Sequence, residues 1–485
     1  MQKDENKIIL ILSTILFLII NIVTLKNGHN WGDDFSQYIM HSKNIVENKD
    51  YTQGFVLNYP SISPPIFPIL LAPLIKIFGI NFQILKIWNI IGWWLFSYFS
   101  FLIANKKLRN PHPILLFTFL LSSPYFFWFK QSILTDIPFS ALITIALFSW
   151  LKYFEAKEKD KKVFYFIISS ILMILAFLTR YIGIVLFLTI FLYLFFIKKE
   201  RLKSFFILFI LLITTFSLSY IQTSIAGYSQ LTLYSYDIRS IIEMLFYAFT
   251  SFFILLFPNL KTLYTYIVPK LTPLIRISII PITTIISTIF FIRIKNKKTD
   301  IIEMFFILYI LSVIFSFQID GPRYFIPILS ILIIFIIKTL YKLLIKFPLN
   351  LSNQIISSFL IIFLFFNIAC APQNFSFNDD IIYLSETQEL LKQMKTIIKK
   401  DEVFIATRPR TLSLLTGLQG AKLHYAPQYP LYFKNLIKKY NVKYFIRLST
   451  VPQEFENLVE THNTEINFSK IWENQHYAIF KISGE

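Results

Sequence analysis

Long apolar stretches separated by short polar ones recur along most of the chain. Each stretch has about 17–25 residues, the length that an α-helix needs to cross a bilayer core. The stretches fall near residues 7–25, 84–104, 113–129, 137–154, 163–179, 181–197, 204–221, 242–257, 277–292, 301–317, 324–341 and 354–371. The pattern predicts an all-α polytopic transmembrane domain over residues 1–371.

Two other regions have a different pattern. The stretch SPPIFPILLAPLIKIFG (63–79), inside the first polar loop 26–83, is apolar but short and rich in proline, which favours helices lying in the membrane interface over a crossing. From about residue 372, ETQELLKQMKTIIKK has helical spacing and is followed by the strand-like EVFIAT; YPLYFKNLIKKY, KYFIRL and YAIFKI continue the alternation. We therefore expect residues 372–485 to form a small α/β domain.

Composition supports a membrane protein and excludes a soluble one. The 485 residues are 55% hydrophobic and only 15% charged, well below the roughly 25% charged residues of soluble domains. The net charge of +19 does not indicate nucleic-acid binding, because Lys and Arg cluster in short loops between apolar segments. Such clusters mark cytoplasmic loops, and those after the second, fourth and sixth segments predict a cytoplasmic N-terminus.

The number of crossings depends on the segment at 242–257. The basic cluster at 293–298 falls on the cytoplasmic side either if this segment does not cross, or if a second short crossing lies within 260–276. The chain then crosses 11 or 13 times, and both odd numbers predict an extracytoplasmic C-terminal domain. The same parity places the polar stretches 26–83, 130–136 and 318–323 on one outer face.

An acidic pair, Asp33 and Asp34, stands in the first of these stretches. It precedes FSQYIMHSKNIV, a predicted helix with Tyr38 on one face. One aspartate is a natural helix cap. Capping does not explain the second carboxylate, because adjacent like charges cost free energy unless a cation or a reacting proton shares the site. Both readings stay open at this point.

Four further residues are candidates on the same face. The sequence places Thr135 or Asp136 at a helix N-cap, yet carboxylates at membrane depth also mark functional cavities. Arg180 and Arg323 lie at the outer ends of predicted crossings, where they either snorkel to the interface or bind a phosphate through the guanidinium fork. Tyr324 follows Arg323 and, like Tyr38, is a candidate hydrogen-bonding group for the same substrate.

Metal and nucleotide signatures are absent from the sequence. The six histidines show no paired ligand spacing, and there is no Walker loop and no GxGxxG turn. These absences exclude an ATP-driven transporter and a Rossmann-fold enzyme that uses a sugar nucleotide. Paired aspartates can hold a divalent ion, but no third ligand is evident, so we expect no cofactor and no metal.

Several motifs, in order, resemble those of the polytopic C-type (GT-C) glycosyltransferases, specifically the bacterial branch similar to protein mannosyltransferases and the aminoarabinose transferase of lipid A. They are WGDDFSQY (31–38), SPPIFPILLAPLIKIFG (63–79), LTDIPF (134–139), LTRYIG (178–183), RYFIP (323–327) and, at the start of the soluble domain, TRPRTLSLLTGLQG (407–420). The resemblance covers nearly the whole chain. This chain has DD where many relatives have DE. The resemblance therefore does not say which aspartate is catalytic, and we favour Asp34.

The resemblance implies a multi-pass enzyme of the bacterial inner membrane that uses a polyprenyl-phosphate-linked sugar. Its partners would be this lipid-linked donor and a lipid, glycan or protein acceptor at the extracytoplasmic face. One carboxylate would act as general base in an inverting displacement. Arg323, with Arg180 or Lys130, would stabilise the leaving phosphate.

Two other classes of protein remain as alternatives. A non-catalytic lipid or glycan transporter would be expected to show internal repeats and broken helices near the midplane, whereas the polar residues here gather at one face. A scaffold that has lost the activity of its relatives is the second alternative.

Overall fold

The computed structural model describes residues 2–51, 53, 56–57, 63–108, 112–226, 299–315, 322–345, 347–370, 381–423, 429–448 and 467–483. Within it the chain divides into two compact units. The helical unit comprises Met1–Leu25, Lys86–Lys130 and Leu134–Ser376; the mixed unit comprises Lys26–Leu85, Gln131–Ile133 and Phe377–Glu485. The predicted segments at 242–257 and 277–292 lie outside the described residues, so the choice between 11 and 13 crossings stays a prediction.

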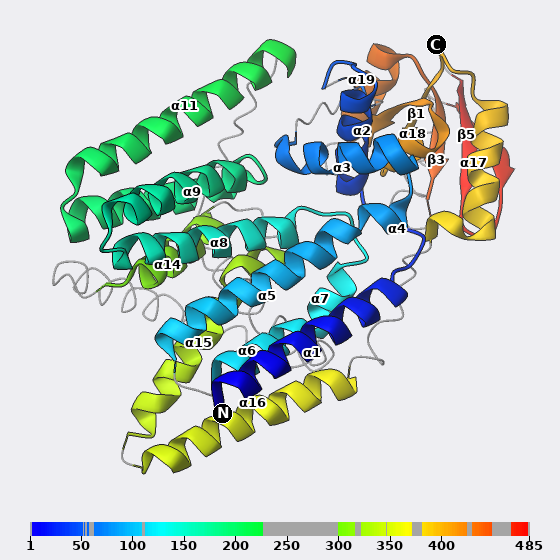
Figure 1. Ribbon diagram of the computed structural model, residues 1–485. Helices are drawn as coiled ribbons and strands as arrows, with labels where there is room; N and C mark the ends of the chain where they lie inside the picture. The colour runs from blue at the N-terminus through cyan, green and yellow to red at the C-terminus, as the bar shows by residue number, and fades with distance from the viewer. Residues whose placement is uncertain are drawn as a thin grey trace. The chain divides into compact units, whose positions relative to one another are not determined.

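The described elements of the helical unit are all helices (Figure 1). They are α1 (Gln2–Val23), α5 (Ile87–Lys107), α6 (His112–Leu121), α7 (Pro124–Phe129), α8 (Asp136–Glu155), α9 (Lys159–Phe177), η1 (Tyr181–Gly183), α10 (Ile184–Leu192), η2 (Tyr193–Lys198), α11 (Arg201–Ala226), α14 (Ile301–Phe315), η4 (Pro322–Phe325), α15 (Ile326–Leu343) and α16 (Leu349–Cys370). These helices coincide with the apolar stretches of the sequence that fall in the described part of the chain.

Five helical stretches within the described residues are long and apolar enough to cross a membrane. They are Phe82–Lys107, His112–Phe129, Asp136–Glu155, Tyr181–Lys198 and Arg323–Leu343. Shorter apolar helices accompany them, including Lys7–Val23 and Leu349–Ile362. The chain is therefore a multi-pass membrane protein, as its composition predicts.

The second of these stretches is not one continuous helix, although the sequence predicts a single segment over 113–129. It breaks between α6 and α7, where Ser123 adopts an extended backbone (φ −61°, ψ 120°) directly before Pro124. A residue before proline is pushed out of the helical region, and proline itself has no N–H to continue the helix. Pro124 instead begins α7, a position that tolerates proline.

Close helix packing in this unit depends on a glycine. A Cβ on Gly92 of α5 would lie 3.1 Å from the Cα and N atoms of Pro138 in α8, so glycine permits the two helices to approach closely. Trp93, the next residue, is buried, and its indole donates a hydrogen bond to the carbonyl of Leu120 at 2.7 Å. The N-terminal turn of α8, which carries Asp136, is thereby packed against the core.

The mixed unit contains a five-stranded sheet and its helices. Their bounds are α2 (Asp34–Val46), α3 (Ile66–Phe78), α4 (Phe82–Leu85), η6 (Ile381–Tyr383), α17 (Ser385–Ile397), β1 (Val403–Ala406), α18 (Pro409–Thr416), β2 (Gln419–Lys422), α19 (Tyr429–Tyr440), β3 (Val442–Arg447), β4 (Asn467–Glu473) and β5 (Ala478–Ser483). The strand order is β2-β1-β3-β5-β4. β2, β1 and β3 are parallel, while β5 pairs antiparallel with β3 and β4.

The carboxy-terminal part of this unit has the α/β alternation that the sequence predicts. The expected helices and strands at α17, β1, α19, β3 and β5 are present; α18, β2 and β4 are additional. β2 is short and reads QGAK, with no run of β-branched or aromatic residues that would reveal a strand. Its pairing with buried β1 makes it a strand.

The first polar loop packs with the carboxy-terminal domain. Val56 forms a bridge with Gly420 of β2, and the Leu57 N–H donates to the Gly420 carbonyl at 3.0 Å. Trp31 is 5% exposed and belongs to the same apolar cluster as Phe404 of β1 and Ile479 of β5. The sequence predicts loop 26–83 as part of the domain 1–371; in the structure Lys26–Leu85 belongs to the compact unit that contains the sheet.

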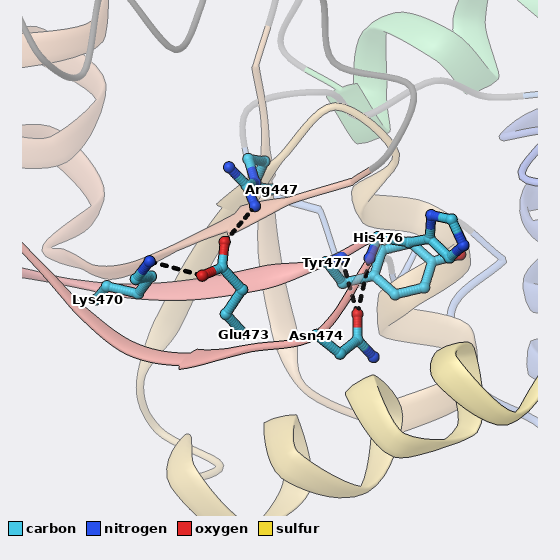
Figure 2. A network of polar contacts seen from close by, with 6 residues as sticks. All are labelled: Arg447, Lys470, Glu473, Asn474, His476 and Tyr477. Atoms are coloured by element: carbon cyan, nitrogen blue, oxygen red, sulfur yellow. Dashed lines mark hydrogen bonds and ion pairs between the residues drawn. The ribbon is translucent and has the colours of Figure 1, made fainter.

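A tight turn that contains Asn474, His476 and Tyr477 joins β4 to β5 (Figure 2). The Asn474 side-chain oxygen accepts the backbone N–H groups of His476 and Tyr477 at 3.1 and 2.9 Å. Arg447 and Lys470 both pair with Glu473 at 2.6 Å on the exposed side of the sheet. The turn holds Tyr477, whose hydroxyl accepts a hydrogen bond from the Trp31 indole at 3.3 Å.

Candidate functional site

The sequence-predicted site residues divide between the two units. Asp33, Asp34 and Tyr38 lie in the mixed unit. The helical unit contains the others, which are Asp136, Arg180, Arg323, Tyr324 and Lys130. Each group is described within its own unit.

The acidic pair stands at the start of α2, but not as a side-chain cap. Asp33 occupies the N-cap position with a helical backbone (φ −84°, ψ −31°), and its carboxylate makes no capping hydrogen bond. Asp34 is the first residue of the helix, where a negative charge interacts favourably with the helix dipole. Asp33 therefore has the N-cap position without the capping hydrogen bond, and its burial needs another explanation.

The two carboxylates have different surroundings. Asp33 is 5% exposed, and neither of its oxygens accepts a hydrogen bond from any residue that the structure describes. Asp34 is only partly buried. Asp34 is therefore the more accessible carboxylate of the pair, and Asp33 is the one that a substrate reaches less easily.

Lys422 of β2 provides the ion-pair partner of Asp33. Its ammonium lies 3.6 Å from Asp33 Oδ2. Burial raises the pKa of Asp33 above its usual range, while the positive charges of Lys422, Arg410 and Arg408 act in the opposite direction. Burial likewise lowers the pKa of Lys422, opposed by the charge of Asp33. We call Asp33, Asp34, Lys422, Arg408 and Arg410 the acidic-pair cluster.

α18 holds the backbone that carries the pair. The Thr411 hydroxyl donates to the Gly32 carbonyl at 2.9 Å and lies 2.8 Å from the Ser36 hydroxyl. Its two partners flank Asp33 and Asp34 on both sides. Nothing in the local sequence pattern around Thr411 or Lys422 indicates that either residue meets residues 32–36.

Tyr38 lies one turn further along α2. Its ring packs edge-on against Phe67 of α3, with the ring centroids 5.2 Å apart. The Ser42 hydroxyl donates to the Tyr38 carbonyl at 2.6 Å. Tyr38 therefore shares a helix with the acidic pair and also fixes α2 against α3.

A second cluster forms in the helical unit, where α8 begins. Arg180 follows α9, and its Nη1 lies 2.5 Å from Asp136 Oδ1 and 3.2 Å from the Thr135 hydroxyl. Asp136 is 2% exposed, and its Oδ2 has no hydrogen-bond partner among the described residues. Thr135 is at the N-cap position without a side-chain cap, so the acid here pairs with a cation and does not cap α8.

Tyr324 extends this cluster. The guanidinium carbons of Arg180 and Arg323 lie 5.1 and 5.3 Å from the centre of its ring, within the range of cation–π attraction. The hydroxyl of Tyr309 donates to the Tyr324 carbonyl at 2.9 Å. We call Asp136, Arg180, Arg323 and Tyr324 the arginine cluster; the structure brings together these four residues, which the sequence distributes over about 190 positions.

A glycine shapes the turn that presents Arg180. The Gly183 N–H donates to the Arg180 carbonyl at 2.8 Å. A Cβ on Gly183 would lie only 2.7 Å from the backbone nitrogen of Phe177. Any side chain here would push the turn away from the end of α9 and move Arg180 from Asp136.

Lys130 does not join the arginine cluster. Its fully buried ammonium donates to the carbonyl of Asn21 at 3.3 Å, to Asn21 Oδ1 at 2.8 Å and to the Thr24 hydroxyl at 2.5 Å. An ammonium has three N–H donors, and these three acceptors match that number. In the described part of the chain Lys130 therefore connects α7 to the end of α1.

An apolar cavity of about 400 Å³ lies in the helical unit between α1, α5, α6 and α7. Its walls include Leu16, Phe17, Trp93 and Phe127. Asn21, a partner of Lys130, also lines it. Such a space suits a hydrocarbon chain better than a soluble sugar.

No group of three potential metal-binding side chains occurs among the residues that the structure describes. The expectation of a metal-independent protein stays a prediction.

Comparison with known proteins identifies the fold. Residues 63–222 match the sequence profile of the family described as "Dolichyl-phosphate-mannose-protein mannosyltransferase". This match spans less than half of the chain. No curated protein matches the chain.

Solved structures match over nearly the whole length. ArnT from Cupriavidus metallidurans in the apo state has 13% identity and a TM-score of 0.60, and 97% of each chain is covered. The same protein bound to undecaprenyl phosphate has 12% identity and a TM-score of 0.56, again over 97% of each chain. The Archaeoglobus fulgidus oligosaccharyltransferase, in complex with Zn and sulfate, has 12% identity and a TM-score of 0.58, over 97% of this chain and 72% of that one.

At this level of identity the matches establish the fold. The chain has the fold of the C-type membrane glycosyltransferases, including the carboxy-terminal α/β domain, because the match to ArnT extends over both units.

Proposed function

We propose that this protein is a membrane glycosyltransferase that transfers a sugar from a polyprenyl-phosphate-linked donor to a lipid, glycan or protein acceptor at the extracytoplasmic face of a bacterial inner membrane. The fold supports this proposal, as do the mannosyltransferase profile and the binding of undecaprenyl phosphate by ArnT. Function nonetheless depends on the site and not on the fold alone.

The observation that carries the proposal is the difference between the two aspartates. Asp34 is partly exposed on the first turn of α2, whereas Asp33 is buried against Lys422. A general base must reach the proton that it removes. Asp34 meets that requirement better than Asp33, and we assign the base to Asp34.

The reaction follows from these groups. The acceptor oxygen attacks the anomeric carbon of the sugar while its proton passes to the Asp34 carboxylate. The bond from the anomeric carbon to the phosphate oxygen breaks, and its electron pair leaves with the polyprenyl phosphate. Attack from the face opposite the phosphate inverts the anomeric configuration, through an oxocarbenium-like transition state as in glycoside hydrolysis.

The leaving phosphate is already anionic, so it needs positive charge more than a proton. Arg323 and Arg180 of the arginine cluster supply guanidinium forks, which suit phosphate oxygens. Asp136 holds one nitrogen of Arg180 and thereby orients the fork. We place the phosphate on these arginines and not on Lys130, whose three donors already have acceptors.

The cavity near α1 gives a place for part of the lipid. Its apolar walls would accept isoprene units without hydrogen bonds, which a polyprenyl chain does not make. Phe127 and Asn21, which line the cavity, also contact Lys130.

The test is a transfer assay on the purified full-length protein. Radiolabelled undecaprenyl-phosphate sugars serve as donors and a membrane extract as acceptor. Asp34→Asn should reduce transfer by about 10²-fold or more, the usual contribution of a general base. Asp401→Asn, which changes an exposed acid of the same unit, is the matched control and should retain wild-type activity.

Two outcomes would contradict the proposal. Transfer that survives Asp34→Asn unchanged would remove the assigned base. A wild-type protein that transfers sugar from none of the donors, yet binds them, would instead favour the lipid or glycan transporter.

A further inference from the structure

The ion pair between Asp33 and Lys422 joins residues 389 positions apart. Asp33 belongs to the acidic motif after the first membrane helix, and Lys422 ends β2 of the carboxy-terminal domain. Their charged atoms are 3.6 Å apart, and neither Asp33 oxygen accepts a hydrogen bond from a described residue. Within the described residues, the Asp33 carboxylate is thus held by the charge of Lys422 and accepts no hydrogen bond.

Burial is costly for both members of this pair. Burial is the largest influence on both groups, raising the pKa of Asp33 and lowering the pKa of Lys422 even though each charge favours ionisation of the other. Both side chains lose hydration on folding, since the Lys422 side chain is 19% exposed and the Asp33 side chain 5% exposed. Buried ion pairs are often no better for stability than neutral side chains of similar size.

The charges around Asp33 come from several elements. Lys422 is on β2, Arg410 is on α18, Arg408 directly precedes α18, and Asp34 is on α2. The three cations all belong to the stretch 408–422 of the carboxy-terminal domain. The same stretch supplies Thr411, whose hydroxyl binds the Gly32 carbonyl.

Functional sites often contain groups whose placement lowers the stability of the folded protein. Here the cost falls on the residue next to the assigned base. Thr411 fixes the backbone before the pair, and Lys422 fixes the side chain of its first member. Asp34, the second member, is the carboxylate that stays accessible.

We propose that Lys422 is a positioning residue for sugar transfer: the carboxy-terminal domain inserts its ammonium behind the acidic pair to hold Asp33 as a fixed negative charge and to orient Asp34 toward the acceptor. This inference rests on the proposed function. It makes the carboxy-terminal domain part of the catalytic apparatus and not an appended binding module.

The first experiment compares rates across pH in the full-length protein. Lys422→Met should lower kcat about tenfold or more with little change in KM for the donor, and should move the acid limb of the kcat–pH profile to higher pH. The shift is expected because Asp33, without its nearest cation, takes up a proton at higher pH. Lys422→Arg keeps the charge and should restore most of the rate.

The matched control is Lys481→Met. Lys481 is an exposed lysine on β5 of the same sheet. Its replacement by methionine changes the net charge and the composition as much as Lys422→Met does, and it leaves the acidic pair intact. It should leave the rate and the pH profile at wild-type values.

The second experiment measures thermal stability and requires no donor. Lys422→Met should lower the melting temperature, since it leaves Asp33 buried without its partner. The double variant Asp33→Asn with Lys422→Met should recover that loss and yet stay slow in transfer. A stable but slow double variant distinguishes a functional pair from a structural one.

Three outcomes would overturn the inference. In one, Lys422→Met behaves as Lys481→Met does. In another, it loses stability and rate with no movement of the acid limb, which indicates a structural role alone. In the third, the double variant melts below Lys422→Met. A wild-type protein that transfers no sugar would instead refute the proposed function, and the melting temperatures would still report whether the two residues are coupled.

Discussion

Trp31 offers a direct test of how the acidic motif is held. It lies two residues before Asp33, yet its side chain is part of the core of the carboxy-terminal domain, in contact with Tyr477. Replacing it by alanine removes an indole that is 5% exposed. The change leaves Asp33 and Asp34 intact, so any effect on them acts through the loop.

The size of the effect can be worked out from the contacts. Truncating a buried tryptophan to alanine costs about 3–5 kcal/mol. The hydrogen bond from the indole to Tyr477, at 3.3 Å, accounts for about 1 kcal/mol of this. Trp31→Phe, which keeps most of the packing and loses the donor, should therefore cost much less than Trp31→Ala.

Amide hydrogen exchange on the full-length protein in detergent measures this cost locally. Because each 1.4 kcal/mol is a factor of about ten, Trp31→Ala should speed exchange in β1, β5 and α2 by roughly a hundredfold or more. Exchange in α8 and α9 should not change. Trp472→Ala is the control, since Trp472 is only half-buried at the edge of the same cluster, and should have a smaller effect.

One result would refute the reasoning. If Trp31→Ala left exchange in β1 and β5 unchanged, the indole would not belong to the core of the domain. The carboxy-terminal domain would then not hold the acidic pair through Trp31. Sugar transfer by the same variant should fall, because α2 would no longer be anchored.

Three further predictions concern charge, packing and pH. Arg180→Met should destabilise the protein by about 3–5 kcal/mol, as expected when a buried carboxylate loses its partner; adding Asp136→Asn should recover most of this in denaturant titrations. Gly420→Ala should cost about 1–3 kcal/mol in the same titrations, because the new Cβ would lie 2.8 Å from the Phe404 ring, and an unchanged midpoint would contradict the packing. Burial raises the pKa of Asp33, so its contribution to stability is present below the pKa of the unfolded chain and is lost as pH rises through the folded value. The melting temperature of Asp33→Asn relative to wild type should accordingly increase as pH rises above the ordinary aspartate pKa of about 4, and a constant difference would contradict the raised pKa.

Local pattern predicted much of the molecule. The apolar stretches match the described helices because crossing a membrane requires a long apolar run, which is a property of neighbouring residues. The acidic pair, Asp136 and Arg180 were also found in the sequence, since charges beside apolar segments are conspicuous. The break before Pro124 leaves no sign in the composition of residues 113–129, which is predominantly apolar.

The sequence did not predict the interaction partners of these residues. The sequence offered Arg180 as a phosphate ligand, and the structure adds Asp136 as its ion-pair partner. The sequence also suggested Lys130 for this role, and the structure adds Asn21 and Thr24 as hydrogen-bond partners of its ammonium. No local rule predicts which charges will meet, because pairing depends on how distant helices pack.

The sequence by itself determined that this is a multi-pass membrane protein with an α/β domain after its apolar segments and carboxylates in the polar stretches between them. Only the tertiary structure decided that the first loop joins the distant domain. Trp31 and Tyr477 are 446 residues apart, and Gly32 and Thr411 are 379 apart. Helix and strand patterns report hydrophobicity over a few neighbouring residues, so they cannot reveal that Lys422 lies behind Asp33; the folded chain brings that charge into place.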